Sequence, residues 1–242
     1  MAKSANTIEY AFLEHCLRED LNDTARRVMA VTHPIRLTVT NYPEGQTELF
    51  DIENNPGHSE DGTRQVAFSR DLYIEADDFL ETPVPKYKRL YPGGPECRLK
   101  GAYLIRCTGC VKDAAGNISE VLCEYDPDSR GGDPADGRKV KGATIHWVDA
   151  NTAVDAEVRL YDNLFSDPEP DAPGKNFLDC LNPDSLTIVA GAKVEASLAG
   201  AKAGDSFQFM RLGYFCADKD STAEHLIFNR SVSLKDSFKL KK

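Results

Sequence analysis

The sequence lacks the short motifs that identify the common nucleotide-binding and metal-dependent enzymes. It contains no G-x-x-x-x-G-K-[ST] phosphate loop, no G-x-G-x-x-G turn after a strand and no H-E-x-x-H pair. Its five histidines have no metal-ligand spacing with one another, and its carboxylates lie in loops from which no catalytic pair can be chosen. The residues alone therefore specify no reaction, and we expect neither a catalytic residue nor a cofactor site in this chain.

Long hydrophobic runs are also missing. No stretch approaches the roughly 20 consecutive apolar residues of a membrane helix, and the mean hydropathy is −0.44. The first residues, MAKSAN, lack the apolar core of a secretory signal. With 41% hydrophobic residues, the 242-residue chain can still form one large core or two small ones. We expect a cytoplasmic protein without a membrane partner.

Cysteines are few and scattered, and their number, seven, is odd. Small buried thiols in a reducing compartment explain them. A zinc site at Cys107 and Cys110 is the sharper alternative, but the chain has no second C-x-x-C pair to complete four ligands. On a regular strand these two thiols would also face opposite sides unless Gly109 bends the chain. We therefore expect no metal site.

The charge is strongly acidic in total but basic in one window. The net charge of −10 argues against a nucleic-acid partner. Residues 86–112, however, contain one acid, Glu96, against seven bases: Lys86, Lys88, Arg89, Arg98, Lys100, Arg106 and Lys112. Such a patch can bind phosphate while the acidic remainder repels non-specific polyanions. Ordinary solvated surface charges remain the alternative.

One helix and many short strands are predicted. Asn6 followed by Glu9 is typical of a helix start, and apolar residues then recur at helical spacing over residues 6–24, so we expect an amphipathic helix whose apolar stripe faces the core. Alternating patterns and turn residues predict strands at 34–40, 64–69, 71–74, 102–106, 118–123, 144–148, 157–161, 186–189, 206–210 and 226–234. Short strands without intervening long helices favour an antiparallel barrel or sandwich.

Several longer strings match a known family in order and spacing. They are YKRL (87–90), RLKGAY (98–103), DPADGRKVKGATIHWV (133–148), VRLYDNLF (158–165), FQFMRLGYFC (207–216) and FNR (228–230). Together they closely resemble the C-terminal half of bacterial glutaminyl-tRNA synthetases. NTIE (6–9) and REDLN (18–22) resemble the helical stretch before it, so the likeness covers nearly the whole chain.

The resemblance implies a mainly β fold with two antiparallel β-barrels of a ribosomal-protein-like topology. A helical segment, residues 1–25, would precede them. Residues 26–84 and 157–242 would form the proximal barrel, and residues 85–156 would form a distal barrel inserted into it. The chain would cross between the barrels at the proline-marked joint 81–85.

The resemblance also implies a parent enzyme, an ATP- and magnesium-dependent class I ligase that attaches glutamine to tRNA. Its catalytic domain, upstream, carries H-I-G-H and K-M-S-K-S type signatures, and neither occurs here. This part alone would be inactive and would serve recognition. The expected partners are tRNA(Gln) and the upstream catalytic domain, with no DNA.

The family's base-contacting positions can be carried over one at a time. Arg27 and Gln208 match residues that bind the middle anticodon base. Lys88, Arg89 and Arg211 match residues around the third base. Arginine and glutamine suit this role because both present paired hydrogen-bonding groups to the edge of an unpaired base.

The remaining positions depart from the family pattern or have a second interpretation. Arg98 and Lys100 match residues near the first base, but Lys100 stands where arginine is common, so bidentate bonding is lost there. Lys86 stands in place of a glutamine, and Gly57 in place of an asparagine. Tyr87, among these cations, could stack on a base or belong to the core, and we favour the core.

Three other functions remain open. The first is a glutamyl-tRNA synthetase of the eukaryotic and archaeal type, which shares this barrel pair, although the string 138–148 favours glutamine. The second is a stand-alone barrel that binds ribosomal RNA. The third is a structural module without a nucleic-acid partner, which would agree with the acidic total charge.

Overall fold

The structure is a computed structural model that describes residues 9–235. It has one α-helix, α1 (Tyr10–Thr24), so the predicted helix is confirmed from residue 10 onward, and the predicted start at Asn6 lies outside the described residues. In its second half, Leu17 and Leu21 pack against Tyr214, whereas Tyr10 and Leu13 at its beginning are exposed. The apolar stripe therefore faces the core only over the second half of the helix.

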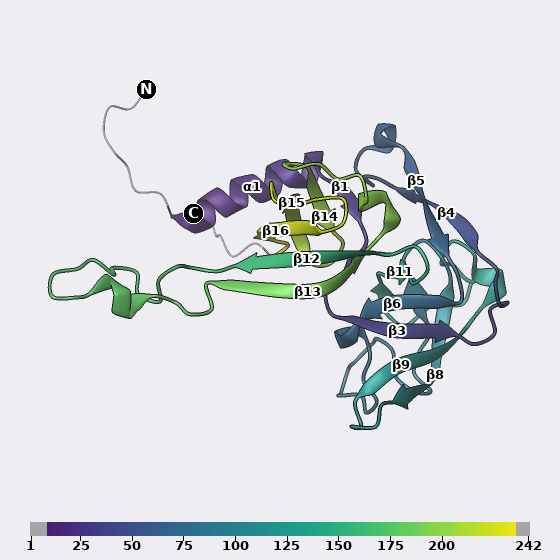
Figure 1. Cartoon of the computed structure of the whole chain (residues 1–242). Helices are drawn as coiled ribbons and strands as arrows, with labels where there is room; N and C mark the ends of the chain where they lie inside the picture. The colour runs from purple at the N-terminus through teal and green to yellow at the C-terminus, as the bar shows by residue number, and fades with distance from the viewer. Residues whose placement is uncertain (1–8, 236–242) are drawn as a thin grey trace.

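The first sheet combines the start of the described chain with its last third, in the order β1-β14-β15-β16-β12-β13-β2. Its strands are β1 (Arg26–Val28), β2 (Ala30–Val31), β12 (Val154–Tyr161), β13 (Leu186–Val194), β14 (Ser206–Phe209), β15 (Gly213–Ala217) and β16 (Leu226–Ser233). Helix α1 lies alongside this sheet (Figure 1).

The second sheet is built from the middle of the chain, in the order β10-β7-β8-β9-β3-β6-β11. Its strands are β3 (Pro34–Val39), β6 (Asp71–Glu75), β7 (Cys97–Leu99), β8 (Leu104–Lys112), β9 (Ile118–Tyr125), β10 (Thr144–Ile145) and β11 (Val148–Asp149). A separate hairpin joins β4 (Glu48–Glu53) to β5 (Thr63–Phe68). Short 3₁₀ helices occupy connections: η1 (Ser59–Asp61), η2 (Ala76–Asp78), η3 (Pro127–Ser129), η4 (Phe177–Cys180) and η5 (Ala196–Leu198).

Both sheets are curled by the same device. The two edge strands of the first sheet, β1 and β2, are separated by Met29 alone, and the edges of the second, β10 and β11, are separated by His146 and Trp147. In each sheet, therefore, one bent segment supplies both edge strands. The bend brings the two edges close together and leaves few backbone N–H and C=O groups of the strands unpaired. The expected mainly β fold with two barrel-like sheets after a short helix is confirmed.

Strand pairing is mixed, and it crosses the predicted domain limits. Among the described strands, β1–β14, β7–β10, β12–β16 and β3–β9 pair in parallel and the other pairs are antiparallel. Strands β3 and β6 come from the range 26–84, yet they pair with β9 and β11 from the range 85–156. The sheets therefore join segments of both ranges, and the division into 26–84 with 157–242 and 85–156 stays a prediction.

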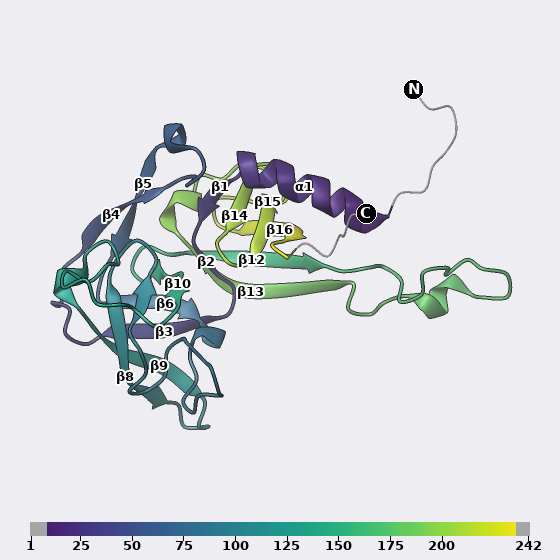
Figure 2. The ribbon, with the colours of Figure 1, turned by 180° about the vertical axis from the view of Figure 1, so that it is seen from behind.

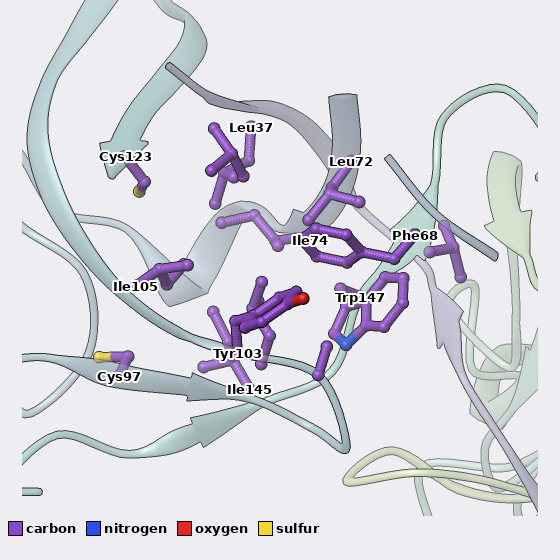
Figure 3. Packing of buried hydrophobic residues seen from close by; sticks show 14 of the residues in the cluster. Leu37, Phe68, Leu72, Ile74, Cys97, Tyr103, Ile105, Cys123, Ile145 and Trp147 are labelled. Atoms are coloured by element: carbon purple, nitrogen blue, oxygen red, sulfur yellow. The ribbon is translucent and has the colours of Figure 1, made fainter. Parts of the chain in front are cut away.

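Aromatic residues fill the core of the second sheet. Trp147, the single tryptophan, lies edge-on to Phe68 with 5.2 Å between ring centroids, and Phe68 lies 5.4 Å from Tyr103 (Figure 3). The Trp147 indole donates a hydrogen bond of 3.1 Å to the carbonyl oxygen of Lys100, so its polar end is satisfied. In the core of the first sheet, Phe209 stacks on Phe215 at 4.2 Å. Each sheet therefore has a core of its own.

Three buried carboxylates, Glu75, Asp78 and Glu195, connect the first sheet to the second sheet or to the β4–β5 hairpin, and we call them the buried carboxylates. Glu195, which follows β13, binds Arg64 of the β4–β5 hairpin with two hydrogen bonds, of 2.5 and 2.8 Å. It also accepts the backbone N–H of Met29, at the bend between β1 and β2, at 2.9 Å. Because both partners of the ion pair are buried, neither can be removed without leaving an uncompensated charge.

Glu75, at the end of β6, fixes the link between β2 and β3. It accepts the backbone N–H groups of Thr32 at 2.7 Å and of His33 at 3.0 Å, and the Nε2 atom of buried His146 lies 3.6 Å from it. Burial by itself raises the pKa of Glu75, but the nearby His146 and the hydrogen bonds from the backbone of Thr32 and His33 outweigh it and lower the pKa from 4.5 to about 2. The charged form is therefore the one that the fold stabilises.

A long arm extends from the first sheet. Strands β12 and β13 form a hairpin whose connecting segment, residues 162–185, reaches beyond the rest of the molecule (Figures 1 and 2). Apolar side chains stay exposed along it: Tyr161, Leu164, Phe177, Leu178, Leu181, Leu186 and Ile188. In the described part of the chain, no helix is long and apolar enough to span a membrane.

The lowered pKa of Glu75 predicts an acid-sensitive contribution to stability. Because the folded-state pKa lies below the unfolded value, the contribution is complete above pH 4.5 and is lost as the pH falls from about 4.5 to about 2. The total is on the order of 3 kcal/mol. In urea unfolding at pH 5 and pH 3, Glu75→Gln should lose distinctly less stability on acidification than the unmodified chain. Glu53→Gln, at an exposed position of β4, is the control. Equal losses in all three proteins would contradict the prediction.

Candidate nucleic-acid interface

Arg27 and Gln208 lie side by side on neighbouring strands. They are direct partners in the parallel pair of β1 and β14, so their side chains leave the same face of the first sheet. The opposite face of β14 carries the core residues Phe207 and Phe209. The alternation of apolar and polar residues in β14 therefore places Gln208 outside the core and next to Arg27.

A shared hydrogen-bond network holds this pair, which we call the middle-base cluster. Arg27 Nη2 donates to the carbonyl and the side-chain oxygen of Asn22 at 3.1 and 3.2 Å. Gln208 Nε2 donates to Tyr214 Oη at 3.0 Å, and this hydroxyl donates to Asn22 Oδ1 at 3.2 Å. Within residues 9–235, Gln208 Oε1 and Arg27 Nε have no hydrogen-bond partner, so an acceptor and a donor remain for a ligand.

Asn55 supports Arg27 from the other side. Its buried side chain accepts hydrogen bonds from Arg27 Nη1 and from the backbone N–H of Gly57, and donates to the Asp23 carbonyl at 2.8 Å. Sequence reasoning missed Asn55, Asn22 and Tyr214. The Asn-Pro-Gly string at 55–57 signals a turn, but it does not show that the asparagine oxygen would meet an arginine.

Two of the predicted third-base residues meet at one buried carboxylate. Arg211, in the turn after β14, holds Asp78 with two hydrogen bonds of 2.7 Å. Arg89 Nη1 lies 3.2 Å from the same carboxylate and donates to the carbonyl of Asp77 at 3.1 Å. We call Asp78, Arg89 and Arg211 the Asp78 cluster. Arg211 follows Gln208 by three residues, so the Cα atoms of these two members of the clusters are at most about 11 Å apart.

Backbone strain also coincides with predicted site residues. Over the described range, Lys86 (φ 67°) and Arg211 (φ 69°) are the non-glycine residues in the left-handed conformation. This conformation costs a non-glycine residue on the order of 1 kcal/mol or more, and such residues cluster at ligand-binding sites. Lys86 itself is exposed.

The remaining cations gather around the strand segment 143–145. Ala143 donates its N–H to the carbonyl of Lys88 at 2.8 Å and accepts the N–H of Arg98 at 3.0 Å. Lys100 donates its N–H to the carbonyl of Ile145 at 2.9 Å. These cations lie up to 55 positions from that segment in the sequence. The parallel pairing of β7 with β10 brings Arg98 and Lys100 to it, and the hydrogen bond from Ala143 brings Lys88.

These cations differ in how free they are. Arg98 donates to the Gly132 carbonyl at 2.7 Å and pairs with Asp133 at 3.0 Å, whereas Lys88 is exposed. Tyr87 is half-buried, and its hydroxyl donates to the Asp77 carbonyl at 3.0 Å. Burial raises the pKa of Tyr87 to about 12, so it stays a neutral phenol. Among the described residues it belongs to none of the apolar cores, and its ring lies 6.3 Å from that of Tyr91, so the expectation that it is a core residue stays a prediction.

Cys107 and Cys110 do face the same side of their strand. A β-bulge between Cys107 and Gly109 shifts the register of β8, so Cys107 belongs to the core and Cys110 packs against it. The extra residue of this bulge is Thr108, between Cys107 and Gly109, and the bulge supplies the change of face on which a zinc site would depend. Within residues 9–235, however, no group of three or more His, Cys, Asp or Glu side chains could hold a metal ion.

Comparison with known families covers most of this chain. Two profiles, both described as class I tRNA synthetases (E and Q), anticodon-binding domain, match residues 25–126 and 144–218. Together they span more than half of the chain and define it as part of a class I aminoacyl-tRNA synthetase. The chain belongs to the family of anticodon-binding domains of the glutamate and glutamine synthetases.

Individual relatives cover the whole chain. It is 51% identical over 242 residues to the glutamine–tRNA ligase of Clostridium perfringens, and the match covers 100% of this chain and 43% of that protein. It is 52% identical over 239 residues to the enzyme of the same name from Aliivibrio fischeri, with 98% and 43% covered. The match from Bradyrhizobium diazoefficiens is 48% identical over 238 residues. The chain therefore spans less than half the length of these relatives and corresponds to their anticodon-binding part.

The buried contacts of Asn55 predict a local stability effect. Asn55→Ala removes the partners of Arg27, of the Gly57 N–H and of the Asp23 carbonyl, so it should lower the free energy of unfolding by about 1–3 kcal/mol. The neighbouring Asn54→Ala removes an exposed hydrogen bond to the Asp61 carbonyl and a long contact of 3.5 Å from Arg64 Nη1, so it should change the free energy of unfolding by less than about 0.5 kcal/mol. Urea unfolding of both variants checks this, and equal values would contradict the role of Asn55.

Proposed function

We propose that this chain recognises the anticodon loop of tRNA(Gln), so that a glutamine–tRNA ligase can attach glutamine to that tRNA. The observation that carries the proposal is identity of about half the residues, along the entire chain, with enzymes named glutamine–tRNA ligase. The proposed ligase acts in the cytoplasm and takes its ATP and magnesium in the rest of the polypeptide. For the residues of this chain we propose no contact with either.

The middle-base cluster supports recognition of one unpaired base. Sequence-specific RNA proteins bind bases that are splayed out of the stack and hydrogen-bond to their edges. Arg27 offers a donor and Gln208 an acceptor from neighbouring strands about 4.8 Å apart, so the two side chains are close enough to converge on the edge of one base. The network through Asn22 fixes both side chains before a ligand arrives, which lowers the entropy cost of binding.

The cations around segment 143–145 support contacts to the flanking nucleotides. Arg98 and Lys100 alternate with buried Leu99, so both side chains leave the outer face there, and we assign them to the first base. Lys86 and Lys88 are exposed and carry point charges that suit phosphates. The acidic remainder of the chain disfavours other polyanions, so these few contacts can be selective.

The exposed apolar arm supports the second proposed partner, the catalytic domain of the same polypeptide. Seven large apolar side chains lie exposed along residues 161–188, which is unusual for a surface that meets only water. A domain attached upstream would have the high effective concentration needed to cover such a surface.

Binding of the chain to an anticodon stem-loop tests the proposal. Glutamine codons have adenine in the middle, so the cognate stem-loop has uridine there. We expect the chain to prefer this stem-loop over one with a different middle base, and Arg27→Ala to reduce the preference by roughly 1–3 kcal/mol. Fluorescence anisotropy titrations measure both. Equal affinity of the unmodified chain for the two stem-loops would refute the proposal.

A lysine variant separates base recognition from general attraction. Lys88→Ala should weaken binding to both stem-loops alike and reduce the slope of log K against log salt by about 1, because it removes one phosphate contact. If Lys88→Ala and Arg27→Ala changed base preference and salt slope in the same way, Arg27 would be acting as a charge and not as a base contact.

The glutamate enzyme remains the second candidate, because the matching profiles describe both amino acids. The aminoacylation reaction of the full-length protein distinguishes them. We expect ATP-dependent attachment of glutamine to tRNA(Gln) and no attachment of glutamate to tRNA(Glu). The opposite preference would assign the chain to the glutamate enzyme and leave only the anticodon-binding role in place.

A further inference from the structure

Asp78 has a fully buried side chain, which is bound by two arginines, Arg89 and Arg211. It ends the 3₁₀ helix η2, its side chain is 0% exposed, and both carboxylate oxygens are engaged by arginines. Its backbone carbonyl accepts the N–H of Leu90 at 3.0 Å, which ties the residue after Arg89 to the same point. An isolated buried carboxylate would be very costly, so these arginines are the condition for its presence.

The two arginines use their donors differently. Arg211 points both terminal nitrogens at Asp78, and its Nη1 also lies 3.3 Å from His146 Nδ1. Arg89 uses Nη1 alone, toward Asp78 and the Asp77 carbonyl. For the described residues, Nη2 and Nε of Arg89 have no hydrogen-bond partner, and this side chain is 39% exposed. Arg89 therefore keeps an intact pair of parallel donors, and Arg211 does not.

We propose that Asp78 is a positioning residue for recognition of the third anticodon base: anchored by Arg211 from the first sheet, it orients Arg89 so that the Nη2 and Nε donors of Arg89 meet the base. This inference rests on the proposed function and deepens it. Glutamine codons begin with cytosine, so the third anticodon base is guanine, whose O6 and N7 acceptors match the parallel donors of an arginine. In this arrangement Arg89 contacts the base and Arg211 acts through Asp78.

The geometry also links the two halves of the interface. Gln208 lies in β14 and Arg211 three residues later, in the β14–β15 connection, whereas Asp78 and Arg89 belong to segments around the second sheet. The ion pair between Arg211 and Asp78 thus fixes the distance between the middle-base cluster and Arg89. Asp78 is placed to set the spacing at which two successive bases are recognised.

The test compares Asp78→Asn with Asp77→Asn in the 242-residue chain. Asp78→Asn keeps the shape of the side chain and removes its charge. Asp77→Asn removes the same charge one position earlier, at an exposed side chain, while leaving the Asp77 carbonyl in place. Anisotropy titrations use three stem-loops: the cognate one, one with the third base changed and one with the middle base changed.

We expect Asp78→Asn to reduce discrimination at the third base by about tenfold while discrimination at the middle base changes by less than about twofold. Asp77→Asn should leave both unchanged. An unchanged third-base ratio in folded Asp78→Asn would overturn the inference, as would an equal loss at both bases, which would indicate a general structural role. Circular dichroism establishes that the variants fold.

If Asp78→Asn does not fold, Asp78→Glu replaces it, because it keeps the charge and displaces the carboxylate by one methylene. Loss of third-base discrimination alone supports the inference, and an unchanged ratio overturns it. An unmodified chain that discriminates the middle base but not the third also overturns it and leaves the proposed function standing. An unmodified chain that distinguishes no base refutes the proposed function and this inference with it.

Discussion

Charge burial at the junction of the two sheets is the constraint on which the rest of this structure depends. Each buried carboxylate joins segments that are distant in sequence: Glu195 with Arg64, Asp78 with Arg211, and Glu75 with the link at Thr32. Each sheet has its own apolar core, and apolar contacts alone are not directional. Buried ion pairs tolerate few geometries, so they fix how one sheet sits on the other.

This constraint explains how an acidic chain can present a selective cationic surface. Many of its arginines are neutralised internally, as Arg138 is by Glu96 and Asp126. The donors that remain available are few and are held in place: those of Arg27 beside Gln208, those of Arg89 beside Asp78, and the exposed lysines of the 86–88 loop. Long-range attraction to polyanions is therefore weak, and binding depends on the fit of individual hydrogen bonds.

Two bent segments do double work in the fold. The segment around Met29 closes the first sheet and carries Arg27 into the middle-base cluster, and the segment around Trp147 closes the second sheet and gathers Lys88, Arg98 and Lys100. Four of the predicted site residues thus lie where a sheet closes on its own edge. Segments anchored at such places are held from two sides, so their side chains are pre-organised for a ligand.

Much of the fold could be predicted from local pattern. The strands at 34–40, 64–69 and 71–74 and the hairpin between 104 and 125 are confirmed because alternation and turn residues act locally. Other elements were missed. The run around Val28 is buried on both faces and has no alternation, whereas β4 does alternate and is not among the predicted strands. The strand predicted at 144–148 is broken at His146 and Trp147, since this segment must supply both edges of a sheet.

The sequence by itself determined the fold class, the family and the residue types able to recognise a base, because patterning and matching strings are properties of neighbouring positions. Only the tertiary structure decided which of those side chains keep free donors. Arg89 and Arg211 look alike in sequence, but one retains an open edge and the other is committed to Asp78. Asp78 and Asn55 carry no sequence signal at all, because burial sets the strength of their hydrogen bonds and burial depends on the tertiary structure. Asp78 is held by Arg211, more than a hundred positions away, and Asn55 by the end of helix α1.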